Sequence, residues 1–218
     1  NNNNNSNGTI TVGPSEHKLG LRASSTCPVH FDKVRVPAEN VVGTVGEGYK
    51  YCIEILNEGR IGIAAQQLGI AKACLYDIAL PYTMERHQFG RPVAEFQGME
   101  HQYAQIATEI HAAELLTYNA CRWKELHAGG SSNSNSNSSH ADVSFVKQAS
   151  MAKLYCSQVA EKTASKTIEW LGGIGFTKDL GAEKFYRDCK VGSIYEGTSN
   201  MQLQTIARLL RAESARSE

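Results

Sequence analysis

A regular spacing of apolar and small side chains between residues 95 and 128 constrains the fold of this 218-residue chain most strongly. These side chains recur at alternating intervals of three and four residues, which places them on one face of an α-helix. They are Phe96, Met99, Tyr103, Ile106, Ile110, Ala113, Thr117 and Ala120. A helix of about 30 residues is ~45 Å long, so we expect it to pack against partners of similar length.

Three further segments have helical periodicity. In 143–171 the inward positions are Phe145, Ala149, Ala152, Cys156, Val159 and Thr163. In 49–86 they are Ile53, Leu56, Ile63, Leu68 and Leu75, and Pro81 should kink or interrupt that helix. A last helix after Ser199 would turn inward Met201, Ile206 and either Leu209 or Leu210. Long helices with such seams predict a mainly α fold, a four-helix bundle.

The rest of the chain divides around this bundle. Residues 1–8 and 129–140 are rich in Asn, Ser and Gly, so we expect a flexible leading segment and a low-complexity loop between two helices. Residues 9–43 read as short strands, with alternation at Val29/Phe31 and Val34/Val36. The bundle domain then occupies 44–218.

Charge and composition exclude several classes of function. Lys and Arg number 22, as do Asp and Glu, so nothing suggests a nucleic acid or an anionic membrane as partner. No apolar run approaches the ~20 residues of a membrane span. We expect no metal site, because neither His-Glu-x-x-His nor Glu-x-x-His occurs.

Two polar segments exceed what a bundle needs. Asn57-Glu58-Gly59-Arg60 lies inside the first long helix, where the glycine costs about 1 kcal/mol relative to alanine. It is either a ligand contact or a solvated turn of helix. The segment 85–92 ends a helix with two arginines around Phe89. It suits a phosphate and a planar ligand, or is an ordinary basic helix end.

The third such segment combines Gly172-Gly173 with the run Ile194–Asn200. Adjacent glycines let the backbone approach a ligand closely, and Thr198-Ser199-Asn200 opens a helix with capping hydroxyls. Glu196 precedes that helix, beside Tyr195. If the aromatic ring shields the carboxylate from water, it becomes a stronger base. Alternatively, Glu196 is a solvated residue that the helix dipole favours.

Six ordered blocks resemble the acyl-CoA dehydrogenase family, and its short- and branched-chain members in particular. They are LGLRASST, FDKVRVP, LNEGRIGIAAQQLGIA, ERHQFGRPVAEFQG, EWLGGIGFTKD and FYRDCKVGSIYEGTSN. The resemblance runs from about residue 8 to 210. It implies that 44–218 is the family's C-terminal four-helix bundle and that 9–43 is a remnant of its middle β domain.

The resemblance implies an FAD-dependent α,β-dehydrogenation of a short or branched acyl-CoA to a trans-2-enoyl-CoA. Glu196 matches the family's base, which removes the α-proton. Members of the isovaleryl type carry the base immediately before the substrate-binding arginine, and in this chain that position is Gly59. Glu58 lies one residue earlier and would point about 100° away on a helix, so Glu196 is the expected base.

The other site residues also follow from the resemblance. Contacts to acyl-CoA fall on Tyr49, Asn57, Glu58, Gly59 and Arg60. Contacts to FAD fall on Arg86, Gln88, Phe89, Gln97, Glu169, Trp170, Leu171, Gly172, Gly173, Thr198, Ser199 and Asn200. In the family the flavin straddles a subunit interface, so several of these residues would touch a neighbour's FAD.

The same resemblance implies a homodimer or a dimer of dimers, electron transfer flavoprotein as electron acceptor, and the mitochondrial matrix as location. Two alternatives stay open. One is a non-catalytic bundle that keeps the family's oligomer interface, which the short β segment favours. The other is an acyl-CoA oxidase, although that relative usually continues further beyond position 210. Because the family's first helical domain and most of its β domain have no counterpart here, we expect weak flavin retention.

Overall fold

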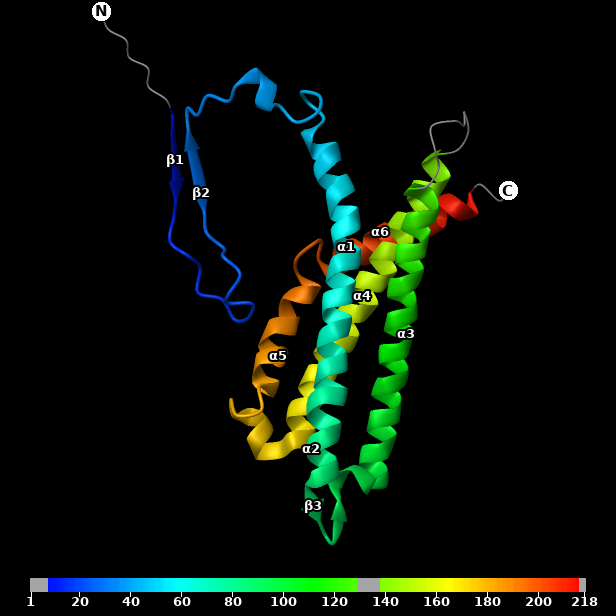
Figure 1. Ribbon diagram of the computed structural model, residues 1–218. Coiled ribbons are helices and arrows are strands. Elements are labelled where there is room, and N and C mark those ends of the chain that lie inside the picture. The colour runs from blue at the N-terminus through cyan, green and yellow to red at the C-terminus, as the bar shows by residue number, and fades with distance from the viewer. Residues whose placement is uncertain (1–7, 129–137, 216–218) are drawn as a thin grey trace, which may run out of the picture.

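The computed structural model describes residues 8–128 and 138–215, most of them helical (Figure 1). The α-helices are α1 (Gly48–Lys72), α2 (Leu80–Glu85), α3 (Gln97–Ala128), α4 (Ser138–Leu171), α5 (Ala182–Cys189) and α6 (Ser199–Ser214). Short helical turns are η1 (Ala38–Asn40), η2 (Ala73–Ala79), η3 (Val93–Glu95), η4 (Gly172–Phe176) and η5 (Lys190–Ser193). The predicted mainly α class is confirmed.

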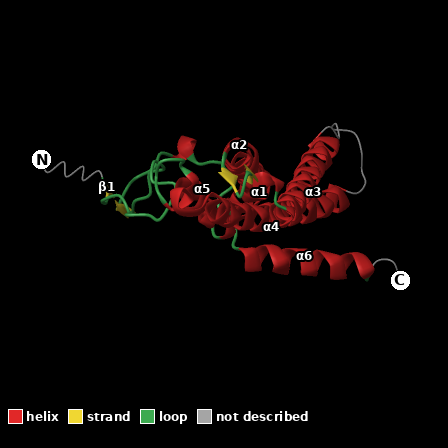
Figure 2. Ribbon diagram, turned by 90° about the horizontal axis from the view of Figure 1, so that it is seen from below, coloured by secondary structure: helices red, strands yellow, loops and turns green. Residues whose placement is uncertain are grey.

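Helix α4 is the centre of the bundle, and α1, α3, α5 and α6 all pack against it. Helix α3 runs antiparallel to α4, since Asn119 pairs with Gln148 while Gln102 pairs with Trp170. Helices α1 and α4 run in the same direction. Helix α6 lies along α4, set apart from α1 and α3 (Figure 2).

The stripes predicted for α3 and α4 form the core. Six of the eight α3 positions are buried, Phe96 and Met99 are half-buried, and all six α4 positions are buried. Many of these residues are alanines, which let the helix backbones approach closely. The Tyr103 ring meets Trp170 edge to face at 4.8 Å between centroids, and its hydroxyl donates to Thr83 Oγ1 at 2.8 Å. This contact joins α2, α3 and α4.

In the outer helices α1 and α6, several residues predicted to face inward are not fully buried. In α1, Leu68 and Leu75 are buried, whereas Ile53, Leu56 and Ile63 are only half-buried. In α6 the prediction for Met201 is wrong: it is 49 % exposed, and Leu209 rather than Leu210 is buried. The inward residue is Gln202, seven positions before Leu209. Helix α6 packs against α4 through this narrow face, and Met201 lies about 100° from it.

The predicted interruption near Pro81 is confirmed, but it begins earlier. Helix α1 passes at Ala73 into the π-helical turns of η2, and α2 follows with Pro81 in its first turn. Proline has no N–H to donate to the preceding turn, and the helix departs from regular α geometry in the π-helical turns just before it. The Thr83 hydroxyl donates to the Ala79 carbonyl at 2.7 Å, across the same junction.

Two small hairpins complete the described chain. Strands β1 (Thr9–Val12) and β2 (Val29–Asp32) pair antiparallel, as do β3 (His87–Gln88) and β4 (Arg91–Pro92). Both strands of the first hairpin are exposed, and Val34 and Val36 lie outside any strand, so that part of the strand prediction is wrong. Of the low-complexity segments, 1–7 and 129–137 lie outside the described residues, and 138–140 already belong to α4.

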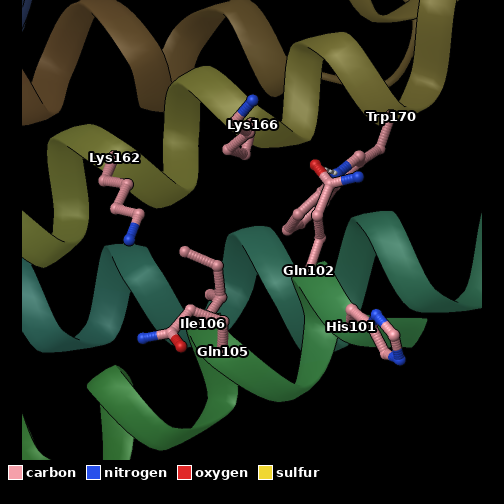
Figure 3. A pocket seen from close by; sticks show the side chains of 7 residues that line it. All are labelled: His101, Gln102, Gln105, Ile106, Lys162, Lys166 and Trp170. Atoms are coloured by element: carbon pink, nitrogen blue, oxygen red, sulfur yellow. Dashed lines mark hydrogen bonds between the residues drawn. The ribbon is translucent and has the colours of Figure 1, made fainter. Parts of the chain in front are cut away.

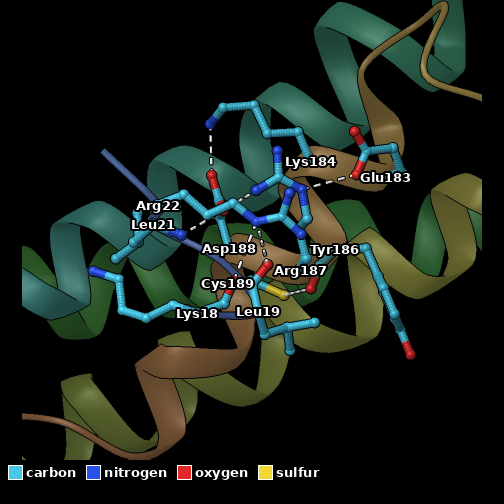
Figure 4. A network of polar contacts seen from close by, with 10 residues as sticks. All are labelled: Lys18, Leu19, Leu21, Arg22, Glu183, Lys184, Tyr186, Arg187, Asp188 and Cys189. Atoms are coloured by element: carbon cyan, nitrogen blue, oxygen red, sulfur yellow. Dashed lines mark hydrogen bonds and ion pairs between the residues drawn. The ribbon is translucent and has the colours of Figure 1, made fainter. Parts of the chain in front are cut away.

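One buried carboxylate attaches the N-terminal segment to the bundle (Figure 4). Asp188 in α5 accepts the Leu21 N–H at 2.7 Å and the Lys184 ammonium at 2.6 Å. Gly20 lies so close that a Cβ there would stand 2.1 Å from the Arg187 carbonyl oxygen. Burial alone would raise the pKa of Asp188, but the hydrogen bonds from Lys184 and Leu21 and the neighbouring cations hold it below its ordinary value.

Asp188→Asn should therefore lower the free energy of unfolding by about 2 kcal/mol at pH 7, because hydrogen bonds to a buried charged group are lost. Urea denaturation measures this, with Asp77→Asn, a change at an exposed aspartate of η2, as the control. Since the folded-state pKa is depressed, the stabilisation exists above the unfolded value and disappears as the pH falls through the folded one. Equal stability of both variants at pH 7 would contradict the role of Asp188.

Candidate functional site

The segment between η5 and α6 carries the candidate base in an unusual backbone conformation. Glu196 has φ +52° and Gly197 has φ +87°, so two consecutive residues are left-handed. Thr198 then caps α6 by accepting the Met201 N–H at 3.4 Å. A left-handed conformation costs a non-glycine residue of order 1–3 kcal/mol and persists only where the surroundings enforce it.

Two buried side chains hold this turn in place. Gln202 Nε2 donates to the carbonyl oxygens of Glu196 at 3.1 Å and Gly197 at 2.8 Å. Lys153 Nζ, from α4, donates to the same Gly197 oxygen at 2.7 Å. The turn is thus tied both to its own helix and to the centre of the bundle.

The Glu196 carboxylate lies against the backbone of α1 at Gly59. A Cβ at position 59 would stand 2.6 Å from Glu196 Oε2, closer than two such atoms approach. Oε2 is buried and has no hydrogen-bond partner among the described residues. Glu196 as a whole is half-buried, but this oxygen is shielded from solvent. The shielding comes from α1, while the Tyr195 hydroxyl bonds to Gln66 Oε1.

Two cations accompany this carboxylate inside the bundle. Arg60 is 9 % exposed, and its Nη1 donates to Ser150 Oγ at 3.1 Å. Burial lowers the pKa of Arg60, and Glu196 opposes that shift. Lys153 is fully buried; its desolvation, with a smaller contribution from Arg60, lowers its pKa to about 8, against the attraction of Glu196.

The sequence analysis missed Lys153 and Gln202, which the structure brings to Glu196. Lys153 falls within the buried stripe of α4, directly after Ala152 and three residues before Cys156. A lysine at such a position is a signal in itself, since charged side chains are almost never fully buried without partners. Gln202 occupies the inward position of α6 that apolarity alone assigns to Met201.

The residues expected to contact acyl-CoA are spread along α1. Gly59 and Arg60 lie beside Glu196. Glu58 instead forms an ion pair with Lys124 on α3, which agrees with its expected direction away from position 59. Tyr49, 80 % exposed at the start of α1, is about 15 Å from Gly59 along the helix axis. Asn57 is half-buried.

Most residues expected to contact FAD line one pocket, which lies away from Glu196. A pocket of about 420 Å³ lies between the start of the β3–β4 hairpin and the end of α4. Its walls include seven of the expected residues, namely Arg86, Gln88, Glu169, Trp170, Leu171, Gly172 and Gly173. A Cβ on either glycine would meet no atom within 4 Å, so the glycine wall is open.

Five expected FAD residues lie outside this pocket. Phe89 is 95 % exposed at the tip of the hairpin, and Gln97 is exposed at the start of α3. Thr198, Ser199 and Asn200 lie at the start of α6, next to Glu196.

A neighbouring pocket of about 340 Å³ extends this region along α3 and α4 (Figure 3). Trp170 belongs to both pockets, and its Nε1 donates to Gln102 Oε1 at 3.1 Å. The two lysines that line it are engaged, Lys162 with Glu109 and Lys166 with Glu169, each at 2.6 Å. Of the residues that line the two pockets, the one arginine is Arg86, which belongs to the pocket with Gly172 and Gly173, the glycine-walled pocket.

The two groups of candidate residues are far apart on one chain. Gly59 and Tyr82, which lines the glycine-walled pocket, are 23 residues apart on the nearly continuous helical path α1–η2–α2. At 1.5 Å per residue that is about 35 Å. A ligand bound beside Glu196 is therefore a different molecule from the one that occupies the Arg86 pocket of the same chain.

The described part of the chain holds neither a cluster of metal ligands nor a helix suited to span a membrane. Within 8–128 and 138–215, no three His, Cys, Asp or Glu side chains gather closely enough to hold a metal ion. In those same ranges, no helix combines the length and the apolar character that crossing a membrane requires.

Comparison with known proteins identifies the family. Residues 46–210 match the family model described as the C-terminal domain of acyl-CoA dehydrogenase. The rat mitochondrial short/branched chain specific acyl-CoA dehydrogenase is 54 % identical over 202 residues, which are 93 % of this chain and 43 % of the rat protein. The chain belongs to the acyl-CoA dehydrogenase family, and the predicted resemblance to its short/branched-chain members is confirmed.

Further relatives add context. The structure of butyryl-CoA dehydrogenase from Megasphaera elsdenii has a TM-score of 0.83 at 35 % identity, covering 94 % of this chain and 50 % of that one. An acyl-CoA dehydrogenase from Bacillus anthracis, complexed with FAD, has a TM-score of 0.84 at 26 % identity over 95 % and 36 %. Subunit CarC of the caffeyl-CoA reductase-Etf complex of Acetobacterium woodii is 37 % identical over 92 % and 49 %. The chain thus spans about half the length, or less, of the proteins it matches.

Gly59→Ala and Gly62→Ala test the contact between α1 and Glu196. Each substitution gains up to about 1 kcal/mol of helix propensity. At position 62 the added Cβ meets nothing within 4 Å, whereas at position 59 it meets the Glu196 carboxylate. In urea denaturation Gly62→Ala should raise the free energy of unfolding, and Gly59→Ala should gain less or lose stability. Equal stabilisation by both would contradict the contact.

Proposed function

We propose that this chain is the catalytic C-terminal part of an enzyme that dehydrogenates a short or branched acyl-CoA to its trans-2-enoyl-CoA. Glu196 is the base that takes the α-proton. The observation that carries the proposal is the Glu196 carboxylate itself, enclosed against Gly59 with Oε2 lacking any partner among the described residues. A carboxylate oxygen that is buried and left without a hydrogen bond can accept a proton from carbon.

The residues around Glu196 suit that task. Arg60 and Lys153 place two positive charges near the Glu196 carboxylate. Arg60 Nη1 donates to Ser150 Oγ and Lys153 Nζ donates to the Gly197 carbonyl oxygen, and neither residue hydrogen-bonds to Oε2. A bound FAD would supply the acceptor for the hydride that leaves the β-carbon, while Glu196 takes the α-proton.

The glycine-walled pocket fits part of an FAD. Arg86 offers a guanidinium for the pyrophosphate, and Gly172-Gly173 leave room for a close approach to the backbone. Because this pocket is about 35 Å from Gly59 along the helical path, we assign it to the FAD of a neighbouring subunit. Thr198, Ser199 and Asn200, beside Glu196, would then serve the chain's own FAD. The assignment implies a homodimer or a dimer of dimers.

The remaining proposals follow from the family. Residues 9–43 are the last strands of a middle β domain, and 44–218 are the bundle domain. Electron transfer flavoprotein would accept the electrons, a proposal that the Etf complex of the CarC relative supports. The rat relative is mitochondrial, and we propose the same compartment, the matrix, for this protein.

Glu196→Gln tests the proposal. The amide keeps the shape of the side chain but cannot accept the α-proton, so turnover of 2-methylbutyryl-CoA in the full-length flavoprotein should fall about 10²–10⁴-fold. The assay follows reduction of a dye acceptor, and Glu125→Gln, on the exposed face of α3, is the control. The midpoint of thermal unfolding should stay unchanged. Wild-type turnover in Glu196→Gln would overturn the assignment.

Flavin retention by the 218-residue chain alone should be weak, because the chain spans only 43 % of the length of the rat relative and carries only part of the expected flavin site. Absorbance at the flavin bands after purification measures it. A full complement of bound flavin per chain would contradict this expectation, and a non-catalytic bundle would bind none even when FAD is added in excess.

A further inference from the structure

Lys153 is the largest fully buried side chain of the described residues, and neither the predicted base nor the predicted ligand contacts involve it. Its neighbours along α4, Ala149, Ala152 and Cys156, are buried as well. A lysine loses several kcal/mol of hydration in such a place unless partners compensate. Its position therefore calls for a physical reason.

The bond that Lys153 makes is specific. Its Nζ donates to the Gly197 carbonyl oxygen at 2.7 Å, one peptide unit after Glu196. The same oxygen accepts Gln202 Nε2 at 2.8 Å, so it is held from α4 and from α6 at once. Gly197 has φ +87° and Glu196 has φ +52°, which is the part of the backbone that most needs such support.

The charges around Lys153 come from two directions. Glu196 faces it from the turn before α6, and Arg60 faces it from α1. Arg60 is directed to Ser150, three residues before Lys153 on α4, by a bond of 3.1 Å. Among the described residues, Glu196 is the one anion that acts on the lysine, and the lysine is bonded to the backbone next to it.

We propose that Lys153 is a positioning residue for the base: by holding the Gly197 carbonyl from the bundle centre, it fixes the left-handed turn that aims the Glu196 carboxylate at Gly59. This proposal rests on the proposed function only for its effect on catalysis. The structural claim, that Lys153 of α4 holds the turn at Gly197, depends on geometry alone. It is tested separately from catalysis.

The first measurement is hydrogen–deuterium exchange of the 218-residue chain. Lys153→Met keeps the length of the side chain but removes its N–H donors and its charge. Amides of 194–202 should exchange at least 10-fold faster in this variant, while those of 103–120 in α3 keep their rates. Lys153→Arg should restore slow exchange, because it again offers a donor to Gly197. Lys162→Met, at a partly exposed lysine of the same helix, is the matched control.

The second measurement is the kinetics of the full-length flavoprotein. A displacement of a catalytic group by about 1 Å costs up to 10²-fold in rate, so Lys153→Met should lower kcat 10- to 100-fold and change KM less than 3-fold. Lys153→Arg should recover at least a third of the wild-type kcat. A residue needed only for folding would not separate kcat from KM in this way.

The outcomes distinguish the two proposals. Unchanged exchange of 194–202 in Lys153→Met overturns the positioning role, and so does exchange that rises uniformly along the chain. If Glu196→Gln retains turnover while 194–202 still loosens in Lys153→Met, the assignment of the base fails but the tie between α4 and the turn stands. Should Lys153→Met not fold, Lys153→Gln, which is polar but too short to reach Gly197, must show the same loosening or the proposal fails.

Discussion

The contact between the Glu196 carboxylate and the bare backbone of α1 at Gly59 is the constraint on which the rest of the site depends. It requires a glycine inside a long helix, where glycine is unfavourable. It also requires a left-handed glutamate just before α6, which is costly as well. Both costs arise at the same point in space, although 137 positions separate the two residues. Such coincidence of local strain is typical of a functional site.

The bundle supplies the framework that sustains this strain. Helix α4 contacts every other long helix, and from its buried face come both Ser150, which directs Arg60, and Lys153, which holds Gly197. The Glu196 carboxylate lowers the cost of burying each of the two cations, while the cations repel each other. Arg60 Nε and Glu196 Oε2 nevertheless have no partner among the described residues. The site is thus held rigidly around atoms that are free to bind something else.

The sequence predicted the helices well because burial in α3 and α4 follows a simple period. Every predicted inward position of α4 is buried, and the interruption near Pro81 follows from proline chemistry. The prediction of inward-facing residues failed where polar side chains are buried. Gln202 rather than Met201 faces inward, and Lys153 lies among the apolar residues of α4. The strand expected around Val34 and Val36 is absent from the described hairpins, since alternation alone does not provide a pairing partner.

In the candidate site, too, the sequence predicted some features and missed others. Motif resemblance named Glu196, Gly59 and Arg60, and the structure brings these three together. It also implied that some of the expected flavin residues serve a neighbour's FAD, but it did not say which of them line one pocket. Nor could it reveal that Gln202 and Lys153 support the turn, because both donate to a backbone carbonyl oxygen, that of Gly197, whose position only the structure gives.

The most direct test of the central claim is a crystal structure of the full-length flavoprotein with an unreactive acyl-CoA analogue bound. The account predicts a Glu196 carboxylate oxygen about 3–3.5 Å from the carbon next to the thioester carbonyl, a distance suited to proton transfer, with Gly59 still against the carboxylate. A Glu196 side chain turned to solvent, with the acyl group bound elsewhere, would contradict it.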